Sequence, residues 1–377
     1  MTQKDMENVE NKQYRPRLQP DEYDMLQKYR AIKDHSNYMG MDERDVDSGW
    51  LKSKEASLHF KNPAFQKPDF KVEDIDWAKI TNSVLDGLID AKSDFDFIGE
   101  TGHCDRTDIF DRLVYTDVHI GMKIPDTAQY GGVWNREVVM DKLSQMIGFV
   151  LFNQKSDILI VDDLGDFMDG MGGKTVRKAH DLPQNMTDQE AFDCGLEFKI
   201  RLARELCSRY KTVYFHNICN DNHSGAFGYT VNSAFKYIAE QIFKNATVDN
   251  YQKFINHYEI KNNTFILCHG KDGKNLRFGF SPHIKDSGKE KINNYIDMEY
   301  LMKKGVRIEF SKGDSHVELS DKATPNRFEY WNYPAFCPAS DWVQTNYVPN
   351  DNGFYFFNYS DTNRYQINPY YFNGRNK

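Results

Sequence analysis

Five short apolar runs along this chain each end in Asp, Asn or His. Their lead polar residues are 49, 56, 47 and 47 positions apart, about the length of one strand, a return helix and the loops between them. In α/β proteins ligands gather outside the carboxyl ends of strands, because loops converge there. The pattern therefore predicts one site built from strand ends, with the lead residues Asp117, Asp166, Asn222, His269 and His316.

Apolar residues between these runs recur at helical spacing. Residues 134–152 and 231–243 have this helical spacing. A third helix is predicted from the T-x-x-E capping box of Thr187 and Glu190 to about Arg209. Strands that alternate with such helices predict βα units. The expected buried faces are Val138, Met146, Ile147 and Val150 in the first helix, Phe192, Leu196, Ile200 and Ala203 in the second, and Phe235, Ile238 and Ile242 in the third.

Residues 1–95 differ from the rest of the chain. A polar start precedes a candidate helix over 21–35, and a proline-punctuated linker leads to an amphipathic helix over 72–94. The region carries no chemical motif. We expect a helical extension that packs on the main domain or binds a protein partner, with the catalytic domain over 96–377.

The tail from about residue 325 is aromatic and strand-like. Residues 326–336 and 353–361 are the two candidate strands, separated by a turn signal at 349–353. We expect both strands to complete a second sheet. Their aromatic side chains could stack on nucleic-acid bases, but packing within a sheet sandwich is the favoured interpretation.

Composition narrows the class of partner. With 377 residues, 40% hydrophobic and 14% aromatic, the chain can bury a sizeable core. Its net charge is -8, and non-specific duplex binding usually requires a basic field. A polyanion would therefore be bound through a local basic patch or through metal ions.

Six scattered cysteines form no CxxC pair, which excludes a zinc ribbon and disfavours a disulfide framework. There is no run of about 18 apolar residues and no apolar signal core in the first 20 residues. The sequence thus predicts a soluble, cytoplasmic protein with reduced thiols and no membrane partner.

The strand-end residues offer only oxygen and imidazole donors, which indicates a metal centre. Asp117 and His119 have the i, i+2 spacing that places two side chains on one side of a strand, and a carboxylate such as Asp166 can bridge two cations. Single motifs have simpler explanations: a helix N-cap for Asp166, a turn for the Asn222–His223 pair, a hydrogen-bonded core histidine for His269. Five motifs in this order favour the metal centre.

The ordered motifs resemble those of the calcineurin-like metallophosphoesterases: D-x-H, G-D-x-x-D/N, G-N-H-D/E, a lone His and G-H-x-H. The match covers about residues 109–320 and implies an α/β fold, a four-layer α/β/β/α sandwich. Three positions depart from the pattern. Asp221 replaces a glycine, Ser224 replaces an acidic residue, and Asp314 replaces the first His of the last motif.

The resemblance implies two divalent metal ions bridged by Asp166, which activate a bridging hydroxide, with His223 protonating the leaving alkoxide. Aspartate at 314 hardens the site, which favours Mn²⁺ or Mg²⁺ over Zn²⁺, with loss of the second metal as the competing outcome. Mn²⁺ is the first expectation, and Mg²⁺, Fe or Zn²⁺ are the alternatives. His103 and His216 are left as structural. The implied ligands are Asp117, His119, Asp166 and His316 for the first metal, and Asp166, Asn222, His269 and Asp314 for the second.

Within the family, the chain is most similar to phage-encoded metallophosphoesterases related to the exonuclease subunit of double-strand-break repair complexes. This resemblance implies a DNA exonuclease or endonuclease of phage replication or repair, acting in the host cytoplasm. The loop at 170–187 supports it with Lys174, Arg177 and Lys178, which could grip a DNA backbone, although a solvated surface loop explains them equally well.

Two alternatives stay open: a phosphomonoesterase of the protein-phosphatase or small-molecule type, and an inactive member that serves as a binding subunit. The sequence indicates no oligomeric state. Because the related nucleases often work as dimers, a homodimer is compatible with the resemblance.

Overall fold

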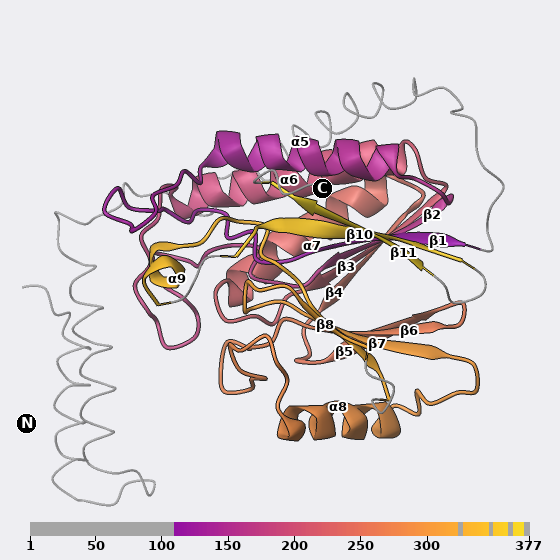
Figure 1. Cartoon of the computed structure of the whole chain (residues 1–377). Helices are drawn as coiled ribbons and strands as arrows, with labels where there is room; N and C mark the ends of the chain where they lie inside the picture. The colour runs from indigo at the N-terminus through magenta and orange to yellow at the C-terminus, as the bar shows by residue number, and fades with distance from the viewer. Residues whose placement is uncertain (1–108, 323–326, 347–349, 361–364, 373–377) are drawn as a thin grey trace, which may run out of the picture. The chain divides into compact units, whose positions relative to one another are not determined.

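The computed structural model describes residues 109–322, 327–346, 350–360 and 365–372. The expected helices over 21–35 and 72–94, His103 and the domain boundary near residue 95 lie outside this part of the chain. The described residues form a mixed α/β structure with two sheets (Figure 1).

The first sheet has six strands in the order β11-β10-β1-β2-β3-β4. Three of the predicted runs, together with β4, form its parallel part, and the tail adds two antiparallel strands. Leu113, Val161, Phe215 and Val248 lie side by side in this register and are all buried. The strands are β1 (Phe110–Tyr115), β2 (Ile158–Asp163), β3 (Thr212–Ile218), β4 (Ala246–Tyr251), β10 (Gly353–Tyr359) and β11 (Tyr365–Tyr371).

Three helices cover one face of this sheet: α5 (Arg136–Phe152), α6 (Asp188–Cys207) and α7 (Gly225–Ile242) (Figure 1). The capping box of α6 is present, with both reciprocal hydrogen bonds between Thr187 and Glu190. The helix ends at Cys207, just before the expected residue, and α7 begins six residues before the expected start. The predicted strand–helix alternation is thereby confirmed.

The buried face of α6 differs from the prediction. Phe192, Leu196 and Ile200 are only partly buried, and the fully buried stripe is displaced around the helix. Each of these three side chains comes directly after a buried residue, so it lies at the edge of the buried stripe and packs against the core from there. In α5 and α7, likewise, Val138, Ile238 and Ile242 are partly buried beside buried neighbours. The buried α6 residues are Ala191, Cys194, Gly195, Phe198, Lys199, Leu202, Ala203 and Leu206.

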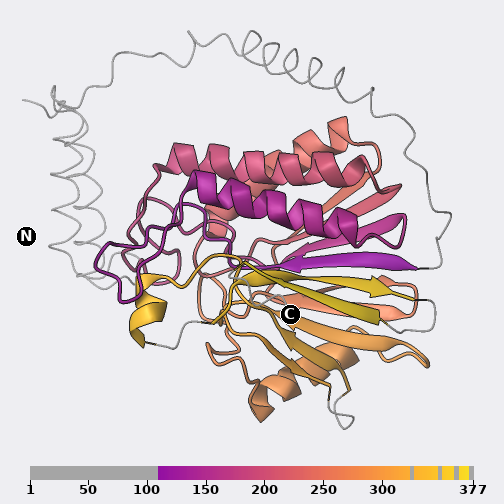
Figure 2. The same ribbon diagram turned by 45° about the horizontal axis from the view of Figure 1, so that its top comes forward.

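The second sheet has five strands in the order β5-β6-β7-β9-β8, and α8 (Asp286–Met298) covers its outer face (Figure 2). One apolar core lies between the two sheets, and another joins Ile292 and Ile296 of α8 to Ile266 and Phe310 of the sheet. The layers therefore run helix, sheet, sheet, helix, as expected. The strands are β5 (Asn256–Ile260), β6 (Asn263–Cys268), β7 (Arg307–Lys312), β8 (Leu319–Asp321) and β9 (Glu329–Asn332).

The tail strands do not both join the second sheet. β9 does, but β10 pairs antiparallel with β1 of the first sheet, where it covers the edge of the parallel strands. Its aromatic residues explain this place, because Phe354 and Phe356 pack towards the helices while Tyr355 and Phe357 pack between the sheets. The interpretation of these aromatic residues as packing within a sandwich is confirmed. A short helix, α9 (Asp341–Asn346), lies between the two strands in sequence.

A buried ion network, Arg112–Asp162–Glu309, joins the sheets. The Arg112 guanidinium donates to Asp162 Oδ2 at 2.6 Å and to a carboxylate oxygen of Glu309. Its Cζ also lies 4.1 Å from the ring centre of Phe265. His216 places Nδ1 2.9 Å from Asp162 Oδ1. His216, which the sequence leaves as structural, therefore contacts this network.

The described cysteines contain no disulfide. All five are free, and most are buried in the cores, where burial raises the pKa of thiols such as Cys219. In the same part of the chain, no helix combines the length and apolar character that a bilayer span requires. The free cysteines are Cys194, Cys207, Cys219, Cys268 and Cys337.

Candidate metal centre

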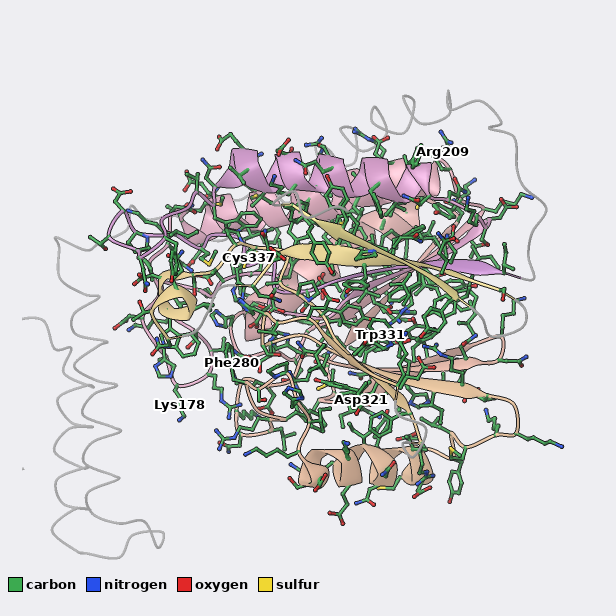
Figure 3. The ribbon with its side chains drawn as sticks, viewed as in Figure 1. Lys178, Arg209, Phe280, Asp321, Trp331 and Cys337 are labelled. Carbon is green, nitrogen blue, oxygen red and sulfur yellow. The ribbon has the colours of Figure 1, made fainter. Side chains whose placement is uncertain are left out.

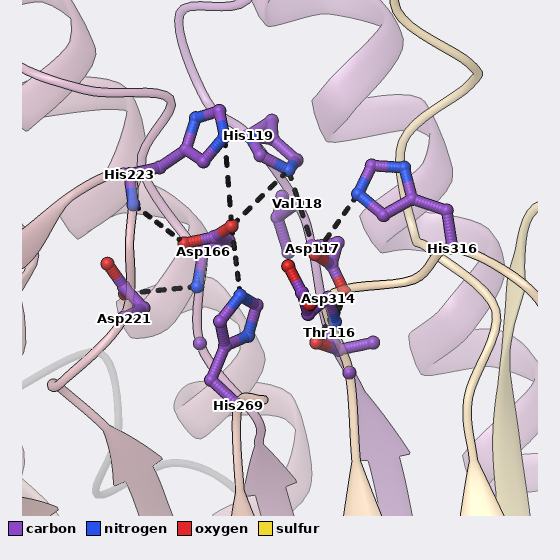
Figure 4. A network of polar contacts seen from close by, with 12 residues as sticks. Thr116, Asp117, Val118, His119, Asp166, Asp221, His223, His269, Asp314 and His316 are labelled. Carbon is purple, nitrogen blue, oxygen red and sulfur yellow. Dashed lines mark hydrogen bonds and ion pairs between the residues drawn. The ribbon is translucent and has the colours of Figure 1, made fainter. Parts of the chain in front are cut away.

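Five strands of the two sheets end at one cluster of Asp and His side chains (Figure 4). Asp117 and Asp166 follow β1 and β2, and His223 follows β3, in the first sheet; His269 comes directly after β6 and Asp314 after β7, in the second. The topology thus brings together segments up to about 200 residues apart, as the strand-end pattern predicted. His119 and His316 complete the cluster.

Much of the cluster's backbone is left-handed. Among described non-glycine residues, positive φ values between 48° and 68° occur at five of the predicted ligands. Such conformations are costly for residues with a Cβ and persist where the surroundings hold them. Hydrogen bonds do so here: Asp117 N donates to Gly165 O, and His119 N to Asp166 O, both at 3.0 Å. The five residues are Asp117, His119, Asp166, Asp314 and His316.

A glycine allows the two sheets to approach at Asp166. Gly165 has φ +99°, and a Cβ there would lie 3.1–3.2 Å from ring atoms of His269. Any other residue would meet both backbone strain and this imidazole. Gly165 therefore lets the carboxylate after β2 come close to the histidine after β6.

Asp166 occupies the centre of the cluster. Its Oδ2 lies 2.9 Å from His269 Nε2, 3.9 Å from His119 Nε2 and 4.0 Å from His223 Nε2. Its Oδ1 accepts the backbone N–H of His223 at 3.1 Å. One oxygen is therefore held by the chain while the other faces three imidazoles, which is the arrangement that a bridging ligand needs.

Asp117 is held in a similar way. Its Oδ2 accepts hydrogen bonds from Thr116 Oγ1 at 2.7 Å and from Asp314 N at 3.1 Å. Its Oδ1 lies 3.1 Å from His316 Nε2 and 3.7 Å from His119 Nε2. The free oxygen again points towards imidazole nitrogens.

These side chains fit divalent cations. Three sets of donor atoms, each within 4.8 Å of one another, occur among the described residues: Asp117 with His119 and His316, Asp166 with His119 and His223, and Asp166 with Asp117 and His269. Buried polar atoms that make no hydrogen bond are costly. Six predicted ligands carry an atom without a hydrogen bond of acceptable geometry, although His269 Nε2 and Asp117 Oδ1 each lie at ion-pair distance from a neighbour. The six atoms are Asp117 Oδ1, His119 Nε2, Asn222 Oδ1, His269 Nε2, Asp314 Oδ2 and His316 Nδ1.

Asp314 stands apart from these sets. Its Oδ1 lies 2.8 Å from Lys271 Nζ, while its Oδ2 is buried and makes no hydrogen bond. Asp314 carries a negative charge that a neutral histidine at this position would not carry. The ammonium of Lys271 offsets this extra charge. The sequence-based prediction did not include Lys271. Its position two residues after the predicted ligand His269 could have indicated a role in the site.

Charges within the cluster shift its protonation. Burial would lower the pKa of His269, but the adjacent Asp166 carboxylate outweighs it and raises that pKa to about 10. The pKa of Asp166 is held well below its usual range, because the charges of His269 and His223 outweigh the cost of burial. Without a cation, a proton on His269 therefore offsets part of the carboxylate charge.

A further carboxylate, Asp169, orients two of the imidazoles. Its Oδ1 lies 2.9 Å from His119 Nδ1, and its backbone oxygen lies 3.0 Å from His223 Nδ1. Both histidines thereby turn Nε2 towards the cluster, and His269 does the same through Nδ1 to Leu164 O at 2.9 Å. Such partners fix the ring orientation of metal-binding histidines. Sequence analysis gave Asp169 no role, although it closes the G-D-x-x-D motif.

Two departures from the family pattern contact each other. The carboxylate of Asp221 accepts hydrogen bonds from Ser224 Oγ at 2.7 Å, Ser224 N at 2.8 Å and Gly225 N at 3.0 Å. It also accepts the backbone N–H of Asp166 at 3.0 Å. Asp221 and Ser224 therefore form one unit that ties the start of α7 to the central carboxylate.

The loop predicted to bind substrate lies against the cluster, but its basic side chains differ in availability. Arg177 Nη1 donates to Asp272 O at 2.8 Å and Leu276 O at 3.1 Å, so it ties two loops together. Lys174 pairs with the exposed Asp181 at 2.5 Å. Lys178 is exposed, at the edge of the molecule (Figure 3).

No family model matches the sequence, and no curated protein does. Solved structures that match include a single mutant of Vps29 from Entamoeba histolytica, at 14% identity over 70% of this chain and 99% of that one, with a TM-score of 0.27. Another is a conserved uncharacterized protein, a predicted phosphoesterase, from Streptococcus pneumoniae TIGR4, at 10% identity over 69% and 97%, with a TM-score of 0.24. At TM-scores this low, fold and chemistry rest on the chain's own sheets and side chains.

Proposed function

We propose that this chain is a metal-dependent phosphoesterase that hydrolyses phosphodiester bonds, with DNA as the expected substrate. The observation that carries the proposal is the set of buried donor atoms around Asp166, which make no hydrogen bond yet converge from five strand ends. A divalent cation accepts lone pairs from carboxylate and imidazole atoms together, so it would satisfy both kinds of donor in this cluster. The hard oxygen donors favour Mn²⁺ or Mg²⁺.

The predicted ligands fall into two groups, one for each cation. Asp117, His119 and His316 would hold one cation, Asn222, His269 and Asp314 a second, and Asp166 would contact both. Two such cations supply Lewis acidity, an activated water and neutralisation of the charge that develops on the phosphate.

His223 would protonate the leaving oxygen. Its Nδ1 is held by the backbone oxygen of Asp169, so Nε2 faces the cluster. The pKa of His223 is raised, because the Asp166 carboxylate outweighs both burial and the neighbouring His119. A raised pKa is the direction of shift that a general acid at this position requires.

A phosphomonoesterase is the second candidate, and the loop at 170–187 favours it. Of its three basic side chains proposed to grip DNA, Arg177 ties the loop to Asp272 and Lys174 is paired with Asp181. A loop tied down in this way leaves fewer basic side chains for a long DNA backbone and suits the lid of a small pocket.

The test is manganese-dependent hydrolysis measured in parallel on end-labelled single- and double-stranded DNA, a bis-ester dye and a mono-ester dye. We expect cleavage of DNA and of the bis-ester, abolished in Asp166→Ala. Turnover of the mono-ester alone would assign the chain to the phosphatases. No turnover of any ester, with metal bound, would support the inactive binding subunit.

A further inference from the structure

The carboxylate of Asp314 is paired with a lysine. Its Oδ1 lies 2.8 Å from the Nζ of Lys271. Asp314 is predicted to share the second cation with Asp166 and His269. Among the described residues, however, these three side chains form no set of donor atoms within 4.8 Å of one another. Ligands of one divalent cation are at most about 4.4 Å apart, which is twice the usual metal–ligand distance. Asp314 must therefore move before it can share a cation with both.

The backbone of the loop after β6 holds Lys271 at this place. Phe278 N donates to Gly270 O at 2.8 Å, and Lys271 forms an antiparallel bridge with Arg277, so the loop folds back on itself. Gly270 has φ +124°, and a Cβ there would lie 3.0 Å from Cβ of Asp314. The glycine therefore allows the backbone beside Lys271 to approach Asp314 closely.

The two partners of this ion pair differ in exposure. The side chain of Lys271 is 21% exposed, whereas that of Asp314 is 3% exposed. A long lysine side chain can turn its ammonium into water while its stem stays packed. The carboxylate cannot leave in the same way, and a divalent cation that approached it would repel the ammonium. A cation and Lys271 would therefore compete for Asp314, and Lys271 is the partner that can give way.

We propose that this chain binds one divalent cation tightly and a second only by displacing Lys271 from Asp314. The inference rests on the proposed phosphoesterase function and concerns the regulation of its metal content. The donor set of Asp117, His119 and His316 would hold the tight cation, because it is complete without Asp314. The chain would then carry one cation at low concentrations of free metal and two at high concentrations.

The test counts the manganese ions bound to the full chain. Equilibrium dialysis with metal analysis by mass spectrometry gives the number of Mn²⁺ ions per chain at each free concentration. Electron paramagnetic resonance distinguishes a single ion from a coupled pair. We expect the wild-type chain to fill in two steps, with the second Kd roughly tenfold or more above the first, which is the scale of a hydrogen bond to a charged group.

Lys271→Met should lower the second Kd by roughly tenfold and leave the first unchanged, because it removes the competing charge. Lys271→Arg keeps the charge and should resemble the wild-type chain. The matched control is Lys274→Met in the same loop. The Lys274 side chain is exposed and pairs with no other described residue, so neither step should change. Asp314→Ala added to Lys271→Met should remove the gain. Melting temperatures show whether each variant folds.

The inference is overturned if Lys271→Met weakens the second step, since the ammonium would then orient Asp314 for the metal. A shift no larger than that of Lys274→Met, or two ions that fill the wild-type chain in one step, would also overturn it. Hydrolysis of the bis-ester in the same samples separates the inference from the proposed function. The expected steps without turnover would support the inference and refute the esterase, and turnover with unshifted steps would do the reverse. A chain that binds no manganese would refute both.

Discussion

Two buried clusters of charge lie on the same three strands. Arg112, Asp162 and Glu309 lie within β1, β2 and β7, and Asp117, Asp166 and Asp314 follow the ends of those strands. In the first cluster every carboxylate is paired: Asp162 with Arg112 and His216, Glu309 with Arg112 and Arg307. In the second, carboxylates and imidazoles converge while buried atoms make no hydrogen bond.

This difference distinguishes a cluster that stabilises the fold from a cluster that can bind a ligand. A buried ion pair is tolerable when its hydrogen bonds are complete, and no polar side-chain atom of Arg112, Asp162 or Glu309 lacks a partner. The strand-end cluster has the same burial and is incomplete. Buried donor atoms of this second cluster make no hydrogen bond within the described residues, so we propose that it is the functional one.

The largest expected effect is in the incomplete cluster. Asp166→Ala should abolish both metal binding and turnover, because it removes the one carboxylate that faces His269, His119 and His223. Metal content by mass spectrometry and hydrolysis of the bis-ester measure the two losses. Asp181→Ala, which removes an exposed carboxylate on the neighbouring loop, should change neither. Retained turnover in Asp166→Ala would refute the two-metal assignment.

His223→Ala should slow kcat by roughly 10²–10⁴-fold and leave metal content unchanged, since general acids contribute on that scale. His180→Ala, an exposed histidine on the 170–187 loop, is the matched control. The ring of His223 also lies within a donor set with His119 and Asp166. If metal and rate fall together, His223 is a ligand instead.

Glu309→Gln tests the complete cluster. It leaves Arg112 buried with only part of its charge balanced, which should lower the free energy of unfolding by about 3–5 kcal/mol at pH 7. Metal content should stay unchanged in the folded fraction. Urea denaturation followed by fluorescence measures the loss, and a change below about 1 kcal/mol would show that the network contributes little.

The same residue predicts a pH dependence of stability. Arg112 and Arg307 outweigh the effect of burial and lower the pKa of Glu309 to about 2, below its unfolded value of about 4.5. The unfolded chain then binds the proton first, so this contribution is full above pH 4.5 and lost as pH falls towards 2. It amounts to about 3 kcal/mol at 1.36 kcal/mol per pKa unit. Glu309→Gln should flatten that part of the stability curve.

The smallest effect concerns protons released on metal binding. Because Asp166 raises the pKa of His269 to about 10, its imidazole carries a proton at pH 7 that a cation must displace. Metal affinity should therefore rise with pH between 6 and 8. Calorimetry in two buffers of different ionisation enthalpy should show release of about one proton or more per chain. Release of none would mean that His269 is not a ligand.

The sequence was sufficient for the parts of the site that local pattern controls. Apolar runs with polar ends place Asp117, Asp166 and His269 at strand ends, and the Thr187 capping box marks a helix start. It was insufficient where partners come from far away. Asp169 and Lys271 gain their roles only through neighbours in space, and whether β10 joins one sheet or the other depends on which edge stays uncovered. The buried stripe of α6 includes Lys199, whose ammonium is paired with Asp163 and Asn217, and apolar periodicity alone does not reveal such partners.

The pairing of β10 with β1 has a consequence for the order of synthesis. Tyr355 lies opposite Val114, and the segment before β10 also holds the site backbone, since Phe336 N donates to Thr116 O at 2.8 Å and Cys337 N to Asp117 O at 3.1 Å. These partners leave the ribosome more than 200 residues after β1. Loop-closing contacts of this kind form late in folding. We therefore expect a nascent chain to acquire its metal only after the tail has been made, so that an incomplete chain carries no active centre.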